Sequence, residues 1–229
     1  MIELHFYFPE LIILVSLSLI ILLDLYLPEK MKKISYYLIQ ISLILCSLFL
    51  YRQLSIDNNY NISIYDFSFF TVIFKLFVVA SLLLIFHYSY IFLSHFEKYQ
   101  TEYFSIILFG LLGIMIMISS RHLLLLYLGI ELLSLSLYSI IAYNKKSTYS
   151  SEAAIKYFIL GAISSGFLLF GISLIYGLTG YLDYENIAST IKGLNLSASE
   201  YSVHSLGLVF ALTFILISLA FKFGAAPFH

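Results

Sequence analysis

Seven long apolar stretches constrain this chain of 229 residues more than any other feature of its sequence. A helix needs roughly 17–25 predominantly apolar residues to cross the hydrocarbon core of a bilayer. Stretches of this kind occupy approximately residues 11–27, 34–51, 67–94, 103–120, 122–142, 152–177 and 203–229. Segments of alternating apolar and polar residues, typical of membrane β-barrels, do not occur. The sequence therefore predicts an all-α fold, a polytopic transmembrane bundle of about seven helices.

Composition excludes the common soluble classes. Hydrophobic residues make up 61% of the chain and charged residues only 11%, with a mean hydropathy of +0.97. Soluble domains are about one quarter charged, so soluble enzymes and nucleic-acid-binding modules are excluded and the bilayer is the expected surrounding. The formal net charge of −1 indicates no bulk attraction to a charged partner. Cys46 is the single cysteine, so it cannot form an internal disulfide and is expected to pack as a small apolar residue.

Lysine and arginine residues predict the orientation of the chain. Loops that follow the first, third and fifth stretches carry six of them, and loops on the opposite side carry three. The positive-inside rule therefore places the N-terminus outside and the Lys145 and Lys146 loop in the cytoplasm or matrix.

One longer loop, about residues 178–202, has an amphipathic pattern. Asp183 is a suitable N-cap for a short helix that places Tyr184, Ile187, Ala188 and Ile191 on one face. We expect this helix to lie at the outer membrane surface, and the alternative is a plain connecting loop.

Four ionisable residues fall inside the apolar stretches. An ionisable group near the bilayer centre costs about 2.5–3.5 kcal/mol even on a lenient scale, so such groups usually face the bundle interior and mark ion or proton pathways. These residues are Lys75, Glu131, Lys156 and Lys222.

Glu131 lies about ten residues into its stretch, roughly 15 Å along a helix. Helical spacing puts it on one face with Tyr127, Ser134 and Tyr138. This polar stripe favours a relay residue, and the alternative is a buried carboxylate that only joins two helices through a hydrogen bond.

Lys222 lies deep in the last stretch, on one face with Ser218 and His229. Gly224 and Pro227 follow closely, and proline cannot continue a helix, so the last helix is expected to be interrupted there. A broken helix beside a buried lysine is typical of intramembrane ion sites. The alternative is a kinked helix with a lysine that extends to the interface.

The other two lysines have stronger structural alternatives. Lys156 has Glu152 four residues before it, which suits a surface ion pair. Small residues spaced at 161/165 and 162/166 predict close packing of the same helix, which favours an inward-facing lysine. Lys75 shares a face with Ser68 and Thr71, and a structural lysine extending to the interface is an equal alternative.

A buried carboxylate and a buried lysine near each other can exist as an ion pair or as two neutral groups, which is what a proton relay requires. The sequence contains no metal-ligand cluster and no glycine-rich dinucleotide motif. We therefore expect no cofactor and no redox chemistry on this chain.

Residues 123–138, 150–166 and 221–229 resemble the fifth, sixth and seventh helices of the antiporter-like proton-pumping subunits of complex I, the respiratory NADH:ubiquinone oxidoreductase. The run Tyr-Gly-Leu-Thr-Gly at 176–180 is also similar. Within that family the likeness is greatest to the N-terminal half of subunit 2 of the mitochondrial complex and its bacterial homologues. It covers about residues 103–229, and residues 1–102 agree only in their number of helices.

The resemblance implies roles for individual residues. The family's carboxylate on the fifth helix corresponds to Glu131, its lysine on the broken seventh helix to Lys222, and a further lysine to Lys156. His229 is included in the expected proton relay, with Tyr127, Ser134, Tyr138 and Ser218 as supporting polar groups. The implied domains are three N-terminal helices in residues 1–102 and the first part of a five-helix repeat in residues 103–229.

The resemblance also implies the setting. Flavin, iron–sulfur clusters and quinone would belong to other parts of the complex, and other membrane-arm subunits would be the partners. The chain stops within the broken helix, so we expect a separately encoded C-terminal half. Tyrosine and phenylalanine are abundant (20 and 21 residues), as in A/T-rich organellar or bacterial genes. The resemblance implies the mitochondrial inner membrane, and the alternative is the bacterial plasma membrane. The competing hypotheses are a piece of a secondary cation/proton antiporter and a purely structural membrane subunit.

Overall fold

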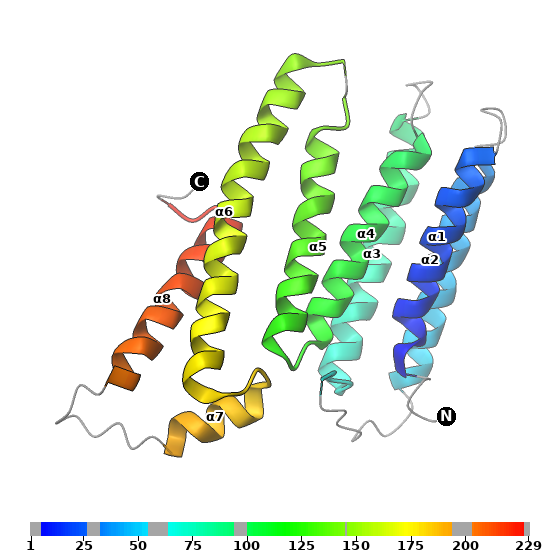
Figure 1. Ribbon diagram of the computed structural model, residues 1–229. Coiled ribbons are helices and arrows are strands. Elements are labelled where there is room, and N and C mark those ends of the chain that lie inside the picture. The colour runs from blue at the N-terminus through cyan, green and yellow to red at the C-terminus, as the bar shows by residue number, and fades with distance from the viewer. Residues whose placement is uncertain are drawn as a thin grey trace.

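The computed structural model describes residues 6–26, 33–54, 64–93, 100–144, 146–193 and 203–226. These residues form an almost entirely helical bundle (Figure 1). The helices are α1 (Phe8–Tyr26), α2 (Lys33–Leu54), α3 (Phe69–Leu93), α4 (Gln100–Ser119), α5 (Leu123–Ile141), α6 (Thr148–Thr179), α7 (Tyr184–Gly193) and α8 (Val203–Lys222). All except α7 are long and apolar enough to cross a membrane, which confirms the seven predicted spans. The chain is a multi-pass membrane protein.

Helix α6 is the longest element and begins earlier than its apolar stretch predicted. Ser147 is the N-cap, and its side chain accepts a hydrogen bond from the Ser150 backbone N–H. Gly180 ends the helix in the left-handed region, with φ of 75°. At 1.5 Å per residue the 32 residues extend about 48 Å. The helix is therefore longer than the hydrocarbon core of about 30 Å.

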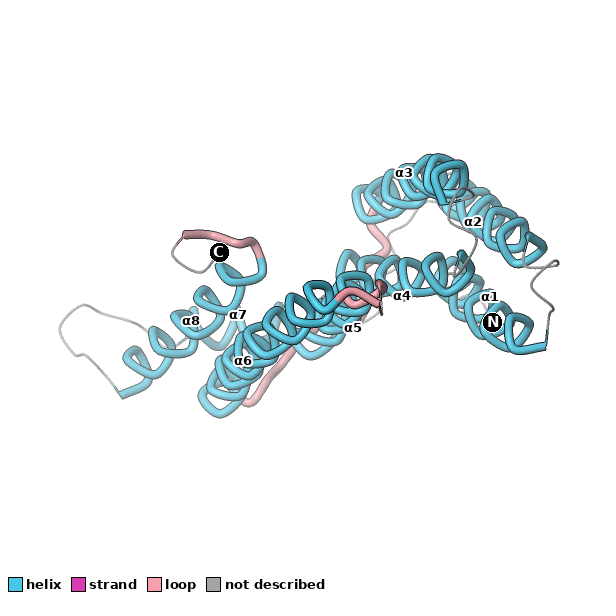
Figure 2. Tube along the Cα trace, turned by 90° about the horizontal axis from the view of Figure 1, so that it is seen from above, coloured by secondary structure: helices cyan, strands magenta, loops and turns pink. Residues whose placement is uncertain are grey.

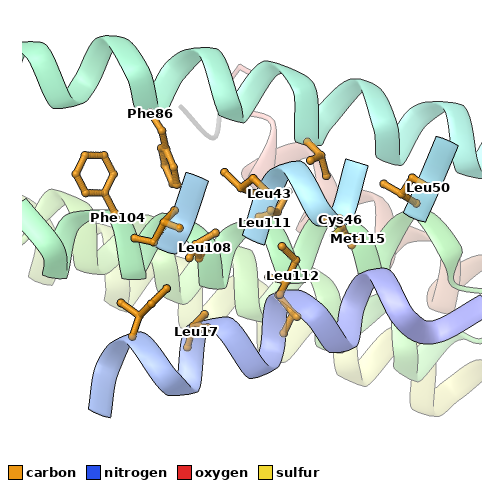
Figure 3. Close-up of a cluster of buried hydrophobic side chains, with 14 of the residues drawn as sticks. Leu17, Leu43, Cys46, Leu50, Phe86, Phe104, Leu108, Leu111, Leu112 and Met115 are labelled. Atoms are coloured by element: carbon orange, nitrogen blue, oxygen red, sulfur yellow. The ribbon is translucent and has the colours of Figure 1, made fainter. Parts of the chain in front are cut away.

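Helices α1 to α4 surround one hydrophobic core. Each contributes fully buried side chains, among them Ile13, Leu43, Val79 and Leu108. Figure 3 shows side chains of this core, Leu43 and Leu108 among them, converging between the helices. Cys46 lies in this core, as its expected packing role required. Helix α4 thus packs into the same core as α1 to α3.

Helices α5, α6 and α8 extend from this core to one side (Figure 2). Two glycines allow α4 and α5 to approach closely, because a Cβ on Gly113 would lie 2.7 Å from the Gly129 carbonyl oxygen. Farther out, a Cβ on Gly171 of α6 would lie 2.9 Å from the Ala211 carbonyl oxygen of α8. These contacts are backbone-to-backbone, so a side chain at either glycine would force the helices apart.

Helix α7 lies across the ends of the spanning helices (Figure 1), which confirms the short amphipathic helix predicted in the loop after α6. Asp183 Oδ2 accepts a hydrogen bond from the Asn186 backbone N–H at 3.1 Å, as expected of the N-cap. The Arg121 side chain, between α4 and α5, forms an ion pair with Glu185 at 2.5 Å. This pair joins the α4–α5 connection to α7.

Candidate proton-relay site

Glu131 and Lys222 approach each other where α5, α6 and α8 meet. Lys222 Nζ lies 3.9 Å from Glu131 Oε2, and the two side chains are only 14% and 26% exposed. Glu131 is eight residues from the start of α5, about 12 Å along the helix. The carboxylate and the ammonium group are thus brought together well inside a membrane-spanning element.

Serine hydroxyls connect the two charged groups. Ser165 of α6 donates a hydrogen bond to Glu131 Oε2 at 2.5 Å. Lys222 Nζ donates to the same Ser165 oxygen at 3.2 Å and to Ser134 Oγ of α5 at 2.7 Å. A continuous hydrogen-bonded path therefore runs from the ammonium group through the Ser165 hydroxyl to the carboxylate. The sequence had suggested Ser165 only as a small packing residue.

Helix α8 ends at Lys222, two residues before Gly224, where the sequence predicted that the last helix is interrupted. Gly224 adopts a left-handed conformation with φ of 61°. Ala225 N–H donates to the Ala220 carbonyl and Gly224 N–H to the Phe221 carbonyl, the two bonds of a Schellman motif. Glycine thus ends the helix before Pro227 is reached. The free carbonyls of the last turn favour a cation, and Lys222 occupies that turn.

The other polar residues predicted on α5 face its neighbours α6 and α8. Tyr138 is buried, and its ring lies edge-on to the Tyr157 ring of α6 with centroids 4.9 Å apart. Tyr127 is half-buried against the small apolar cluster formed by α5 and α6. Ser218 of α8 hydrogen-bonds Ser164 of α6 at 3.1 Å, so it joins these two helices beside the pair.

Lys156 lies apart from this cluster. Its Nζ pairs with Glu152 Oε1 at 2.6 Å, and the lysine side chain is 70% exposed. The predicted i, i+4 pair is present, and the Gly161 and Ser165 face of α6 packs against α5 as expected. A Cβ on Gly166, by contrast, would meet none of the described residues within 4 Å. A relay role for Lys156 remains a prediction.

Two expected elements of the site, His229 and Pro227, lie outside the described residues. Among the residues that the structure describes, no three His, Cys, Asp or Glu side chains are grouped as metal ligands would be.

A second buried ion pair was not predicted. Lys75 of α3 is 1% exposed and donates a hydrogen bond to Glu10 Oε1 of α1. Of the two alternatives for Lys75, the structure therefore favours an inward-facing lysine over one that extends to the interface. Glu10 was missed because its apolar stretch was taken to begin at residue 11, whereas α1 begins at Phe8. The sequence could have indicated this pair, since Glu10 directly precedes the first apolar stretch and Lys75 lies inside the third.

The fold and the Glu131–Lys222 cluster define a polytopic helical membrane protein with an acid–base pair inside its spans. Residues 120–229 match the family described as NADH:quinone oxidoreductase/Mrp antiporter, transmembrane region. Glu131, Ser165 and Lys222 lie within the matched residues, whereas Glu10 and Lys75 lie before them.

Similarity to individual proteins extends over nearly the whole chain. NADH-quinone oxidoreductase subunit N of Ruthia magnifica subsp. Calyptogena magnifica is 40% identical over 225 residues, 96% of this chain and 45% of the relative. Subunit N of Thioalkalivibrio sulfidiphilus is 41% identical with the same coverage. The chain thus spans about 45% of the length of these relatives.

Solved structures share the same helical arrangement. A chain of respiratory complex I from Thermus thermophilus, solved with bound aureothin, superposes with a TM-score of 0.72 at 26% identity, covering 96% of this chain and 45% of that one. An archaeal membrane-bound sulfane sulfur reductase superposes with a TM-score of 0.78 at 22% identity, which indicates a common fold alone. The two subunit N relatives are bacterial. In each of them one polypeptide contains both the part that matches this chain and the rest of the subunit. They give no support to a mitochondrial origin or to a separately encoded C-terminal half.

Proposed function

We propose that this chain translocates protons as a membrane subunit of a respiratory NADH:quinone oxidoreductase, without a redox centre of its own. The observation that carries the proposal is the hydrogen-bonded path from Lys222 through Ser165 to Glu131. The path lies within the residues that match the oxidoreductase and antiporter family. Similarity to bacterial subunit N over 96% of the chain supports the same assignment.

In this proposal the relay moves one proton between two arrangements of equal total charge. The Lys222 ammonium gives a proton to the Ser165 oxygen as the Ser165 hydroxyl proton passes to Glu131 Oε2. An N–H bond and an O–H bond break, two O–H bonds form, and a neutral amine and a neutral carboxylic acid result. Later loss of the Glu131 proton to a neighbouring acceptor and return of a proton to Lys222 complete a step.

The energies of the two arrangements are comparable. Unit charges about 4 Å apart attract each other by about 4 kcal/mol at an effective dielectric constant of about 20. Removing each ion from water costs several kcal/mol, so the attraction does not lock the pair in its charged form. A change in charge nearby can then shift the proton from one group to the other.

The setting is part of the same proposal. Other membrane-arm subunits are the partners, and flavin, iron–sulfur clusters and quinone act elsewhere in the complex. Because the named relatives are bacterial, we propose the bacterial plasma membrane in place of the mitochondrial inner membrane. Lys156 and His229 are further relay candidates by family resemblance.

The test uses the assembled oxidoreductase carrying Glu131→Gln, reconstituted in sealed liposomes. Glutamine keeps the shape of the side chain and accepts a hydrogen bond from Ser165, but it cannot take up the proton. We expect assembly to persist and protons pumped per NADH oxidised to fall strongly. Glu185→Gln is the matched control, because Glu185 is an exposed residue of α7 that makes only a surface ion pair. Full pumping by assembled Glu131→Gln complex would reject the relay.

A cation/proton antiporter is the second candidate, because the matching family also includes Mrp antiporters. Co-purification distinguishes the two. Migration of the chain with flavin and iron–sulfur subunits supports the respiratory role, whereas proton exchange that requires sodium and proceeds without NADH supports the antiporter. A purely structural subunit would tolerate Glu131→Gln with pumping intact.

A further inference from the structure

Glu10 and Lys75 form a buried ion pair at the opposite end of the molecule from Lys222. Glu10 is 8% exposed and Lys75 is 1% exposed. The pair joins α1 to α3 inside the four-helix core and lies outside residues 120–229, which match the oxidoreductase family. The relay at Glu131 makes no use of it.

One oxygen of this carboxylate has no partner. Glu10 Oε1 accepts the hydrogen bond from Lys75, but Glu10 Oε2 is buried and has no hydrogen-bond partner among the described residues. An ionised carboxylate has acceptor capacity on both oxygens, and a dry, unpaired acceptor is costly when it carries charge. A proton on Oε2 removes the charge and turns that oxygen into a donor. The unpaired oxygen is therefore the place where this site would accept a proton.

The lysine has a second set of partners that do not depend on the carboxylate charge. Lys75 Nζ lies 5.9 Å from the centre of the Tyr65 ring and 5.8 Å from the centre of the Phe67 ring. Aromatic faces attract an ammonium group at this separation, more strongly when water is excluded. The two rings can thus hold the Lys75 cation when Glu10 becomes neutral.

The surrounding groups leave Glu10 as the proton acceptor. On α2 the Cys46 thiol donates to the Pro9 carbonyl at 3.7 Å, and Arg52 is exposed. Burial raises the pKa of Tyr65, and the Glu10 and Tyr7 charges raise it further, so Tyr65 stays a neutral phenol. Asp66 is bonded to Ser68 and Thr71 instead of Lys75.

The ionisable residues of α4 do not reach the pair. Glu102 and Tyr103 lie at the start of that helix, whereas Tyr65 pairs with Ser120 just beyond its end. About 17 residues of helix, roughly 25 Å, separate the two ends. Lys75 is therefore the cation that faces Glu10 within the described core.

The position of the pair suits exchange with water at one membrane face. Glu10 is two residues from the start of α1 and Lys75 six residues from the start of α3, about 3 and 9 Å along those helices. Helices α1, α3 and α5 begin at the same end of the bundle (Figure 1). The pair is thus nearer to that end than Glu131 is.

We propose that Glu10 and Lys75 form a second proton-binding site, in which Glu10 takes up a proton from water at Oε2 and the Tyr65 and Phe67 rings retain the Lys75 ammonium. The O–H bond formed on Glu10 comes from hydronium, which leaves as water, and the charge of the site changes from zero to +1. A sodium ion is not the expected ligand, since a single free carboxylate oxygen beside an ammonium group supplies too few oxygens and the wrong charge.

Infrared difference spectroscopy of the full chain, purified in an ester-free detergent, tests the proposal. Lowering the pH should produce the carbonyl stretch of a protonated carboxylic acid, and Glu10→Gln should remove one carboxylic-acid equivalent from it. Glu131→Gln is the matched control and should leave the Glu10 contribution in place. This experiment measures proton binding and not pumping, so its result does not depend on whether the relay proposed at Glu131 is correct.

A single and a double variant at Lys75 complete the test, each compared in folded protein. Lys75→Met removes the counter-charge, so the Glu10 carboxylic-acid band should persist at pH values where the wild-type band has disappeared. If Glu10→Gln alone fails to fold by circular dichroism, the double variant Glu10→Gln with Lys75→Met, which buries no charge, replaces it in the comparison. An infrared difference spectrum that is the same with and without the Glu10 carboxyl, in folded protein, overturns the proposal.

Discussion

The Tyr138 hydroxyl occupies the space that a side chain at Gly161 would need. A Cβ on Gly161 would lie 1.8 Å from Tyr138 Oη and 2.6 Å from Tyr138 Cζ. Tyr138 is buried and its ring packs edge-on against Tyr157 and Phe158, so it has little room to move. This contact sets the separation of α5 and α6 one helical turn from Ser165.

Gly161→Ala is therefore expected to lower the thermal stability of the purified chain, with an overpacking cost of about 1–3 kcal/mol. Pushing α6 from α5 should also lengthen the hydrogen bond from Ser165 to Glu131. Gly166→Ala is the control, because a Cβ there meets nothing within 4 Å and helix propensity favours alanine. Equal melting temperatures for the two variants in detergent would contradict this account of the contact.

The membrane-spanning helices were predictable because hydropathy is a local property of the sequence. Each span needs only its own apolar residues, and all seven were found. Helix α7 was predictable for a similar reason, since Asp183 and the apolar face that follows it are adjacent in the sequence. The start of α6 was less accurate, because the capping hydrogen bond of Ser147 is not reported by hydropathy, whereas Gly224 and Pro227 indicated the end of α8 from the sequence.

The contacts of the charged residues depend on packing between distant helices. Glu131 and Lys222 were chosen from the cost of burying charge, but the local spacing around Ser165, which connects them, indicated helix packing and not a hydrogen bond to either charge. Lys156 shows the limit of this reasoning, since small residues on the same helix suggested an inward lysine and its side chain is exposed. Glu10 was missed because the predicted start of the first span, residue 11, lies three residues after the start of α1 at Phe8.

Ser165→Ala removes the hydroxyl that lies between the ammonium group and the carboxylate. A hydrogen bond to a charged group contributes about 1.5–3 kcal/mol, so proton translocation by the assembled complex should slow by about tenfold or more. Ser165→Thr keeps a hydroxyl and should restore most of the rate. A merely structural role predicts instead that threonine, which is larger in a buried position, is at least as harmful as alanine.

Asp66 is expected to make the stability of the α3 N-terminus depend on pH. Partial burial alone would raise its pKa, but hydrogen bonds from Thr71 and Ser68 and the Arg121 charge outweigh it and leave the pKa below its ordinary value. A carboxyl whose pKa is lower in the folded state stabilises the protein above its unfolded pKa of about 4, and this contribution is lost as the pH falls through the folded value.

Asp66→Asn should therefore lower the stability at neutral pH by less than about 1 kcal/mol, seen as a lower melting temperature, because the carboxylate is only partly buried and is screened by water. The difference from wild type should shrink below about pH 4. Thr71→Val, which removes one of the donors, should reproduce part of this pH dependence. A melting difference that is constant from neutral pH to about pH 3 would show that the carboxylate charge is not responsible.

Lys222→Met should lower proton translocation by the assembled complex by about 10²-fold or more, the usual contribution of a positioned proton donor. Lys222 shares the Ser165 hydroxyl with Glu131, whereas Lys75 belongs to a separate pair in the α1 to α4 core. Lys75→Met leaves Glu10 buried without its partner, so its main effect should be on the amount of assembled complex, since breaking a buried pair costs about 3–5 kcal/mol. Pumping is therefore compared per assembled complex, with NADH oxidation measured on the same liposomes. Equal losses of pumping in the two assembled variants would mean that the Glu131 cluster is not the principal relay.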